Sequence, residues 1–180
     1  MWAILNLKRN HMSLLPIVTV PDPSLRTVSM PVEKIDAALK RLAADMFETM
    51  YEAPGVGLAA IQVGVPRRLL VVDVADEDEV RQPLVLINPR ILRLGDTTRV
   101  YEEGCLSLPD VRLDIERPAT VTAAYTDIEG KQHEIEAAGL LAIVIQHEID
   151  HLDGKLIIDF LTRLKRDMIV RKLKKQARIG

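Results

Sequence analysis

Apolar residues recur along this chain with spacings that predict three helices. Between residues 31 and 51 they return every three or four positions, as on one face of a helix. These positions are Ile35, Leu39, Leu42, Met46 and Met50. A continuous apolar run, Leu140–Ile145, predicts a second helix over about 140–152 that ends near Gly154. A third helix, rich in Lys and Arg, is expected over about 162–177.

Shorter segments rich in β-branched residues predict strands. They are expected near 68–74, 84–88, 98–103, 120–126 and 131–137. The last two are joined by Asp127-Ile128-Glu129-Gly130, which favours a hairpin. At 180 residues and 48% hydrophobic composition, the chain is long enough for one domain with a sizeable core. We therefore predict an α+β fold in which antiparallel or mixed sheets pack around the second helix, with a helix at the C-terminus.

Neither a membrane span nor a secretory signal is indicated. The longest apolar run, Leu140–Ile145, is far shorter than a bilayer requires. Residues 1–11 lack the charged start and small-residue cleavage site of a signal peptide. We expect a cytoplasmic protein without membrane contact.

The predicted second helix contains His147-Glu148-Ile149-Asp150-His151. Four-residue spacing places both imidazoles on one helix face, where they can share a divalent metal while Glu148 reaches a water on it. This pattern is typical of hydrolytic metal sites. The alternative is a buried helix that carries two incidental histidines.

A catalytic metal with two helix histidines needs a third protein ligand. No glutamate follows Glu148, and the position six residues after His151 is Ile157, so neither common downstream ligand is present. The chain's one cysteine, Cys105, completes a set of one thiolate and two imidazoles. A lone cysteine can also be a small buried hydrophobe. It excludes an intramolecular disulfide, which fits a reducing compartment.

A glycine-rich segment, Gly55–Gln62, satisfies the G-x-G-x-x-A form of a dinucleotide-binding loop. Such a loop follows a strand and opens a helix, whereas here a helix comes before it and a strand after it. Nucleotide binding is therefore disfavoured. The glycines instead allow the backbone to approach a ligand closely, and the Gln62 amide can donate to an oxyanion.

Taken together, these segments resemble the peptide deformylases, whose motifs are G-x-G-x-A-A-x-Q, E-G-C-L-S and Q-H-E-x-D-H-L-x-G. The chain carries all three without substitution at Gly55–Gln62, Glu103–Ser107 and Gln146–Gly154. The resemblance implies a hydrolase that removes the formyl group from N-formyl-methionyl nascent peptides. It implies a catalytic domain over 12–161 and, within the same domain, a basic helix over 162–180. Residues 1–11 precede the usual start and receive no function.

The resemblance also implies roles for individual residues. Cys105, His147 and His151 would hold the metal, and Glu148 would carry the proton from water to the leaving amine. The backbone N–H of Leu106 would join Gln62 as an oxyanion donor. By ligand type the site suits zinc, but the family pattern favours Fe²⁺, with Zn²⁺, Ni²⁺ or Co²⁺ able to substitute.

Substrate selection is expected to depend on shape. A narrow space near Gly57 and Leu106 would admit formyl and exclude acetyl. The methionine side chain would occupy an apolar slot lined by Ile143 and Val144, one turn before His147. Further wall positions are expected from Val56 and Tyr101.

Charge is concentrated at the C-terminal end. From Arg163 onward, eight Lys or Arg face one acidic residue, Asp167, a net of +7 in a chain whose total is −2. A solvated helix face is one interpretation, and a polyanionic partner is the other. The resemblance favours the ribosome. No base-reading aromatics accompany the charge, so specific DNA binding is not expected.

Other functions remain as alternatives. A structural zinc module would need a fourth ligand, and His11 and His133 lie in no motif. An RNA-binding protein without catalysis would have no use for Gln62 or Glu148. The nearest enzymatic alternative is an HExxH-type metallopeptidase.

Overall fold

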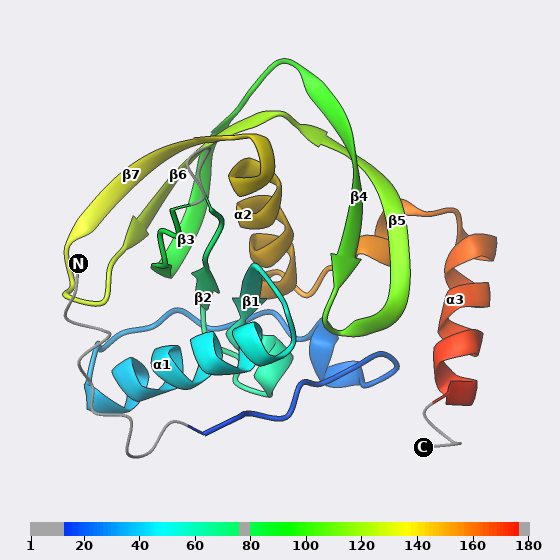
Figure 1. Ribbon diagram of the computed structural model, residues 1–180, viewed down its shortest axis with the longest axis horizontal. Helices are drawn as coiled ribbons and strands as arrows, with labels where there is room; N and C mark the ends of the chain where they lie inside the picture. Colours follow the sequence, from blue (N-terminus) through cyan, green and yellow to red (C-terminus); the bar gives the residue numbers. More distant parts are fainter. Residues whose placement is uncertain (1–12, 76–79, 177–180) are drawn as a thin grey trace.

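The computed structural model describes residues 13–75 and 80–176 (Figure 1). Its elements, in chain order, are η1 (Pro23–Arg26), α1 (Ala37–Glu52), β1 (Gly57–Ala59), η2 (Ala60–Val63), β2 (Leu69–Val72), β3 (Leu84–Leu94), β4 (Thr98–Cys105), β5 (Leu108–Pro118), β6 (Thr120–Thr126), β7 (Gln132–Ala138), α2 (Gly139–Leu152), η3 (Ile157–Phe160) and α3 (Arg163–Gln176). The predicted α+β class is confirmed.

A five-stranded sheet forms the centre of the described structure. Its strands lie in the order β1-β2-β3-β6-β7, and every neighbouring pair is antiparallel. Because successive side chains of a strand point to opposite faces, β2 contributes to two cores. Leu69 and Val71 pack with α1 residues such as Met46, whereas Leu70 and Val72 pack with residues of α2. The sheet is therefore covered by α1 on one face and by α2 on the other.

β4 and β5 form a separate two-stranded ribbon, and α2 lies between this ribbon and the sheet (Figure 1). Leu106 and Ser107 connect the two strands, so that Cys105 pairs with Leu108. The register then shifts, because Gly104 pairs with Arg112. Such an irregularity bends a strand locally, and here it lies directly before Cys105, whose Sγ approaches His151 of α2.

The predicted elements are present, with differences at their boundaries. α1 begins at Ala37 because the Asp36 side chain caps the helix by accepting from the Leu39 N–H. The strand expected over 84–88 continues to Leu94, and the one expected over 98–103 continues to Cys105. β5 was not predicted at all, although its alternation of apolar and charged residues is a strand signal. β1 is too short to give such a signal.

Parts of three predictions lie outside the described residues: the segment 1–11, positions 12 and 76–79 of the catalytic domain, and positions 177–180 of the basic C-terminal helix. Within 13–75 and 80–176, no helix is long and apolar enough to cross a bilayer.

Candidate metal centre and substrate cleft

α2 brings the two histidines of the helix motif together. The apolar run that precedes them buries this helix, and His147 and His151 are 8% and 1% exposed. One helical turn separates them, so their Nε2 atoms lie 3.2 Å apart. Two nitrogen ligands of one tetrahedral ion with bonds of about 2.0–2.1 Å would lie about 3.3 Å apart. The spacing of the pair suits a shared ion.

Cys105 lies at the end of β4, where the ribbon approaches α2. Its Sγ is 3.2 Å from the Nε2 of His151, and the three donor atoms of Cys105, His147 and His151 lie within 4.8 Å of one another. No other group of this kind is found in the described ranges. One thiolate and two imidazoles fit a divalent transition metal and leave a fourth position for water.

A buried ionic network orients the His147 ring through Nδ1, the ring nitrogen that does not face the other metal-ligand candidates. Glu103 Oε2 accepts from the His147 Nδ1 at 2.9 Å, which leaves Nε2 directed at the other donors. Arg117 donates from Nε to Glu103 Oε1 at 2.5 Å and from NH1 to Asp150 Oδ2 at 2.8 Å. Burial raises the pKa of Glu103, but hydrogen bonds from His147 and Arg117 outweigh it and hold this pKa below its ordinary value. The sequence reasoning gave these supporting residues no role.

Glu148 is 4% exposed and lies against the glycine-rich segment. A Cβ built at Gly57 would be 2.6 Å from Glu148 Oε1 and 2.7 Å from Val144 Cγ1, so any side chain there would have to displace them. The Glu148 Oε2 atom is buried and has no hydrogen-bond partner among residues 13–75 and 80–176. Burial raises the pKa of Glu148 to about 7. Its carboxyl group can therefore accept and return a proton near neutral pH.

Gln62 lies beside the metal-ligand candidates. Its Oε1 accepts from the Ala59 N–H at 2.8 Å, while its Nε2 lies 3.1 Å from Ser107 Oγ and 3.7 Å from Cys105 Sγ. The amide hydrogens thus face the same space as the thiolate. Leu106 follows Cys105 in the turn between β4 and β5.

A cleft of about 570 Å³ opens onto these groups. The positions predicted to contact substrate, Val56, Gly57, Tyr101, Ile143 and Val144, all line it. It is also lined by predicted catalytic and metal positions, namely Gln62, Cys105, Leu106, His147 and Glu148. The structure therefore gathers residues from α2, β1, β4 and the β4–β5 turn around one cavity. Charged positions on its wall, such as Glu102 and Arg112, were not anticipated.

Comparisons with known proteins agree on one family. A family model described as polypeptide deformylase matches residues 14–167. The peptide deformylase of Rhizobium meliloti (strain 1021) is 58% identical over 167 residues, which is 93% of this chain and 96% of that protein. A crystal structure of peptide deformylase from Ehrlichia chaffeensis superposes with a TM-score of 0.89 at 42% identity, covering 93% of this chain and 98% of the other. Another structure, of the Ehrlichia chaffeensis enzyme in complex with actinonin, gives 0.88 at 44% identity, covering 92% and 98%.

Proposed function

Because this chain belongs to the polypeptide deformylase family, we propose that the cleft beside Cys105, His147 and His151 is its active site. The protein is a hydrolase that removes the N-formyl group from formyl-methionyl peptides and releases formate. One observation carries the placement of the site. Three donor atoms of metal-ligand type converge beside a buried carboxyl group at the wall of a large cleft.

The proposed metal ligands are Cys105, His147 and His151, and the proposed ion is Fe²⁺. When bound, a divalent ion supplies a Lewis acid that makes water a nucleophile near neutral pH. The ligand types also accept Zn²⁺, Ni²⁺ or Co²⁺, so purified protein can carry any of these. Glu103 supports the set by holding the His147 ring through Nδ1.

Glu148 is the proposed proton carrier. It accepts the proton of the water that attacks the formyl carbonyl and then delivers this proton to the amine nitrogen as the C–N bond breaks. A pKa of about 7 allows both steps, because neither protonation state is strongly disfavoured at neutral pH. The absence of a side chain at Gly57 lets the protein's own backbone lie close to this carboxyl group.

Two N–H groups are proposed to stabilise the oxyanion that develops on the formyl oxygen. One is the backbone N–H of Leu106, and the other is the side-chain amide of Gln62, whose Nε2 faces Cys105. Loss of one such donor typically raises the barrier by about 3–4 kcal/mol. These donors act on the transition state more than on the bound substrate, so their loss should lower kcat.

Specificity is proposed to follow from the walls of the cleft. Gly57 and Leu106 both line the cleft, and a tight fit near them would admit the hydrogen of a formyl group but clash with the methyl of an acetyl group. Ile143, Val144 and Tyr101 offer apolar surface for the unbranched methionine side chain. β1 is an edge strand, so the rest of the peptide can pair with its main chain independently of sequence.

The test compares two substrates. Protein reconstituted anaerobically with Fe²⁺ is incubated with a formyl-methionyl peptide and with the same peptide lacking the formyl group. We expect formate from the first and no cleavage of either peptide chain. Hydrolysis of an internal peptide bond would instead support the metallopeptidase, which the family assignment does not favour.

We also propose a partner and a location. Nascent formyl-methionyl chains are exposed at the ribosome in the cytoplasm, and the basic face of α3 is available to bind there. Leu164 and Met168 of this helix are 72% and 61% exposed, and Arg171 and Lys175 are exposed beside them. Basic side chains around an exposed apolar strip suit a surface made of RNA phosphates and protein.

A further inference from the structure

Ser107 contacts the proposed oxyanion donor from a fully enclosed position. Its side chain is 0% exposed, and Gln62, which is 1% exposed, donates from Nε2 to Ser107 Oγ at 3.1 Å. Ser107 is neither a candidate metal ligand nor one of the residues that line the cleft. The Ser107 hydroxyl therefore contacts Gln62 but does not face the cleft in which the substrate would bind.

Two contacts together determine how the Gln62 amide is turned. The Ala59 N–H can only donate, so the atom bonded to it at 2.8 Å is the acceptor Oε1 and the other amide atom is Nε2. One hydrogen of Nε2 is engaged by Ser107 Oγ, and Nε2 also lies 3.7 Å from Cys105 Sγ. The second hydrogen is directed at Cys105 Sγ, which is a weak acceptor, so it is the one that the reacting carbonyl oxygen can take over.

An extended segment near the N-terminus joins the two residues independently of this side-chain contact. The Val18 N–H donates to the Gln62 carbonyl oxygen at 2.7 Å, and the Val20 N–H donates to the Ser107 carbonyl oxygen at 2.9 Å. Val20 is 6% exposed and packs in the core that includes Leu108. The backbones of Gln62 and Ser107 are thus bridged by one short stretch of chain.

We propose that Ser107 is a positioning residue for deformylation, whose hydroxyl fixes the Gln62 amide so that one N–H is directed at the oxyanion. This inference rests on the proposed role of Gln62 as an oxyanion donor. Without the hydroxyl, the amide keeps its bond to Ala59 but can swing its N–H away from the reacting oxygen. A donor that is no longer pre-oriented stabilises the transition state less.

The first experiment measures Ser107→Ala in the metal-loaded enzyme with a formyl-methionyl peptide. We expect kcat to fall roughly tenfold, which is less than the 10²–10³-fold that complete loss of a donor typically causes. KM and metal content should not change. Ser29→Ala is the matched control, because Ser29 is also buried, at 3% exposed, and its Oγ has no partner among the described residues. Its kcat should equal that of the wild type.

A double-mutant cycle separates this role from general packing. Gln62→Met keeps the length of the side chain and removes its N–H groups, so this variant alone tests the proposed function of Gln62. In the Gln62→Met background, Ser107→Ala should cause no further loss of kcat. A full tenfold loss in both backgrounds would overturn the positioning role. If Gln62→Met lowers kcat while Ser107→Ala does not, this inference is wrong and the proposed function stands.

A second measurement uses the wild-type protein and does not depend on a variant that folds. In zinc-loaded, ¹⁵N-labelled enzyme, the side-chain amide of Gln62 should exchange its hydrogens with solvent far more slowly than that of Gln132, which is exposed on β7. Exchange as fast as that of Gln132 would show that the amide is not held, and would contradict the proposal.

Discussion

At Gly57 the main chain passes so close to Glu148 that an added side chain would have to displace the Glu148 side chain. Gly57→Ala should displace the carboxyl group, because the added Cβ would lie 2.6 Å from Glu148 Oε1. We expect kcat to fall at least about 10²-fold, the lower range of a general acid-base contribution. Stability should fall by only about 1–3 kcal/mol, as overpacking typically costs. Kinetics, thermal melting and metal content on the same preparation test this, and unchanged kcat would place Glu148 outside the reaction.

At the scale of single residues, the sequence predicted the groups whose spacing is local. His147, Glu148 and His151 follow from one helical turn, and the lone cysteine was the remaining ligand type. The supporting groups could not be predicted in this way. Arg117 reaches Glu103 over 14 positions, and only because β4 and β5 pair as a ribbon against α2. The contact between Arg117 and Glu103 depends on tertiary packing, which cannot be deduced from a short sequence motif.

At the scale of elements, the ribbon and α2 are joined by the buried network around Arg117. Its side chain is 5% exposed, and its guanidinium contacts Glu103 on β4 and Asp150 on α2 and lies 4.9 Å from the Phe160 ring centre. Arg117→Ala would leave Glu103 buried without its cation. We expect the free energy of unfolding to fall by about 3–5 kcal/mol, together with weaker metal retention.

Arg93→Ala is the control for this prediction. Arg93 also pairs with a glutamate, Glu136, but the two side chains are 72% and 80% exposed. Its loss should change the free energy of unfolding by less than about 1 kcal/mol. Equal effects of the two substitutions in urea unfolding would show that the buried network does not hold the ribbon to α2.

Asp159, in η3, forms ion pairs with one residue of η1 and one residue at the start of α3. The contribution of these ion pairs to stability should depend on pH. Asp159 forms ion pairs with Arg26 and Arg166. Burial raises the pKa of Asp159, but hydrogen bonds from Arg26 and from the Leu156 N–H, together with the charges of Arg26 and Arg166, outweigh it and the pKa lies below its ordinary value. The ion pairs of Asp159 therefore contribute fully to the free energy of unfolding above the pKa that Asp159 has in the unfolded chain, about 3.9. This contribution is lost as the pH falls through the pKa of Asp159 in the folded protein.

Asp159→Asn should remove this contribution, which for a partly exposed pair is at most about 1 kcal/mol. Urea unfolding at pH 7 and at acid pH measures it. The difference between wild type and variant should be largest at pH 7 and should shrink below about pH 4. A difference that grows on acidification would mean that the pKa of Asp159 is raised on folding.

The sequence predicted those helices and strands in which the pattern of apolar residues continues over many positions. The regular three-to-four spacing gave α1, and the apolar run before His147 gave α2. The alternation of Val111, Leu113 and Ile115 with charged residues is an equally regular strand signal, so the sequence also contains the information that predicts β5. The register shift between Gly104 and Cys105 has no such pattern, because a bulge depends on local backbone geometry and on the packing of its neighbours.

At the scale of the whole molecule, a basic helix is attached to an acidic body. α3 packs through Leu173, 3% exposed, against the core that includes Val111 and Ile115 of β5. Because of this contact, we propose that α3 is part of the same domain as the strands that precede it. Deleting the helix would also expose this core, so neutralising its outer charges is the cleaner test.

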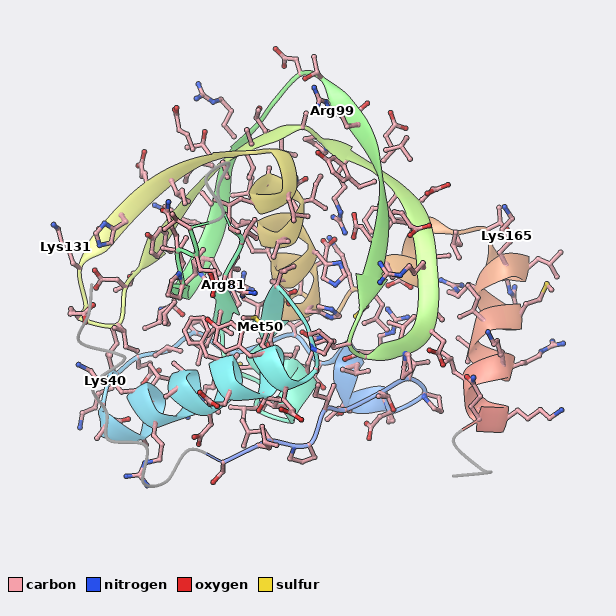
Figure 2. All side chains as sticks on the ribbon, viewed as in Figure 1. Lys40, Met50, Arg81, Arg99, Lys131 and Lys165 are labelled. Carbon is pink, nitrogen blue, oxygen red and sulfur yellow. The ribbon has the colours of Figure 1, made fainter. Side chains whose placement is uncertain are left out.

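We expect Lys165→Gln with Arg171→Gln to weaken association with ribosomes while deformylation of a short peptide is unchanged. The matched control neutralises Lys40 and Lys131, which are exposed and lie on the opposite side of the molecule from Lys165 (Figure 2). Cosedimentation at low and high salt measures both, and binding of the wild type should fall steeply with salt. If the two double variants cosediment with ribosomes to the same extent, the basic residues of α3 do not bind the ribosome and simply face solvent.

The central claim is that Cys105 holds the metal and that Glu148 carries the proton. The most direct test measures bound metal per chain and deformylase turnover together in Cys105→Ser and Glu148→Gln. Glu148→Gln should keep its metal and lose about 10²–10⁴-fold in turnover, because only the proton carrier is removed. Cys105→Ser should lose metal and turnover together, because a hydroxyl is a poor substitute for a thiolate ligand. A fully loaded, active Cys105→Ser protein, or a Glu148→Gln protein with wild-type turnover, would contradict the account.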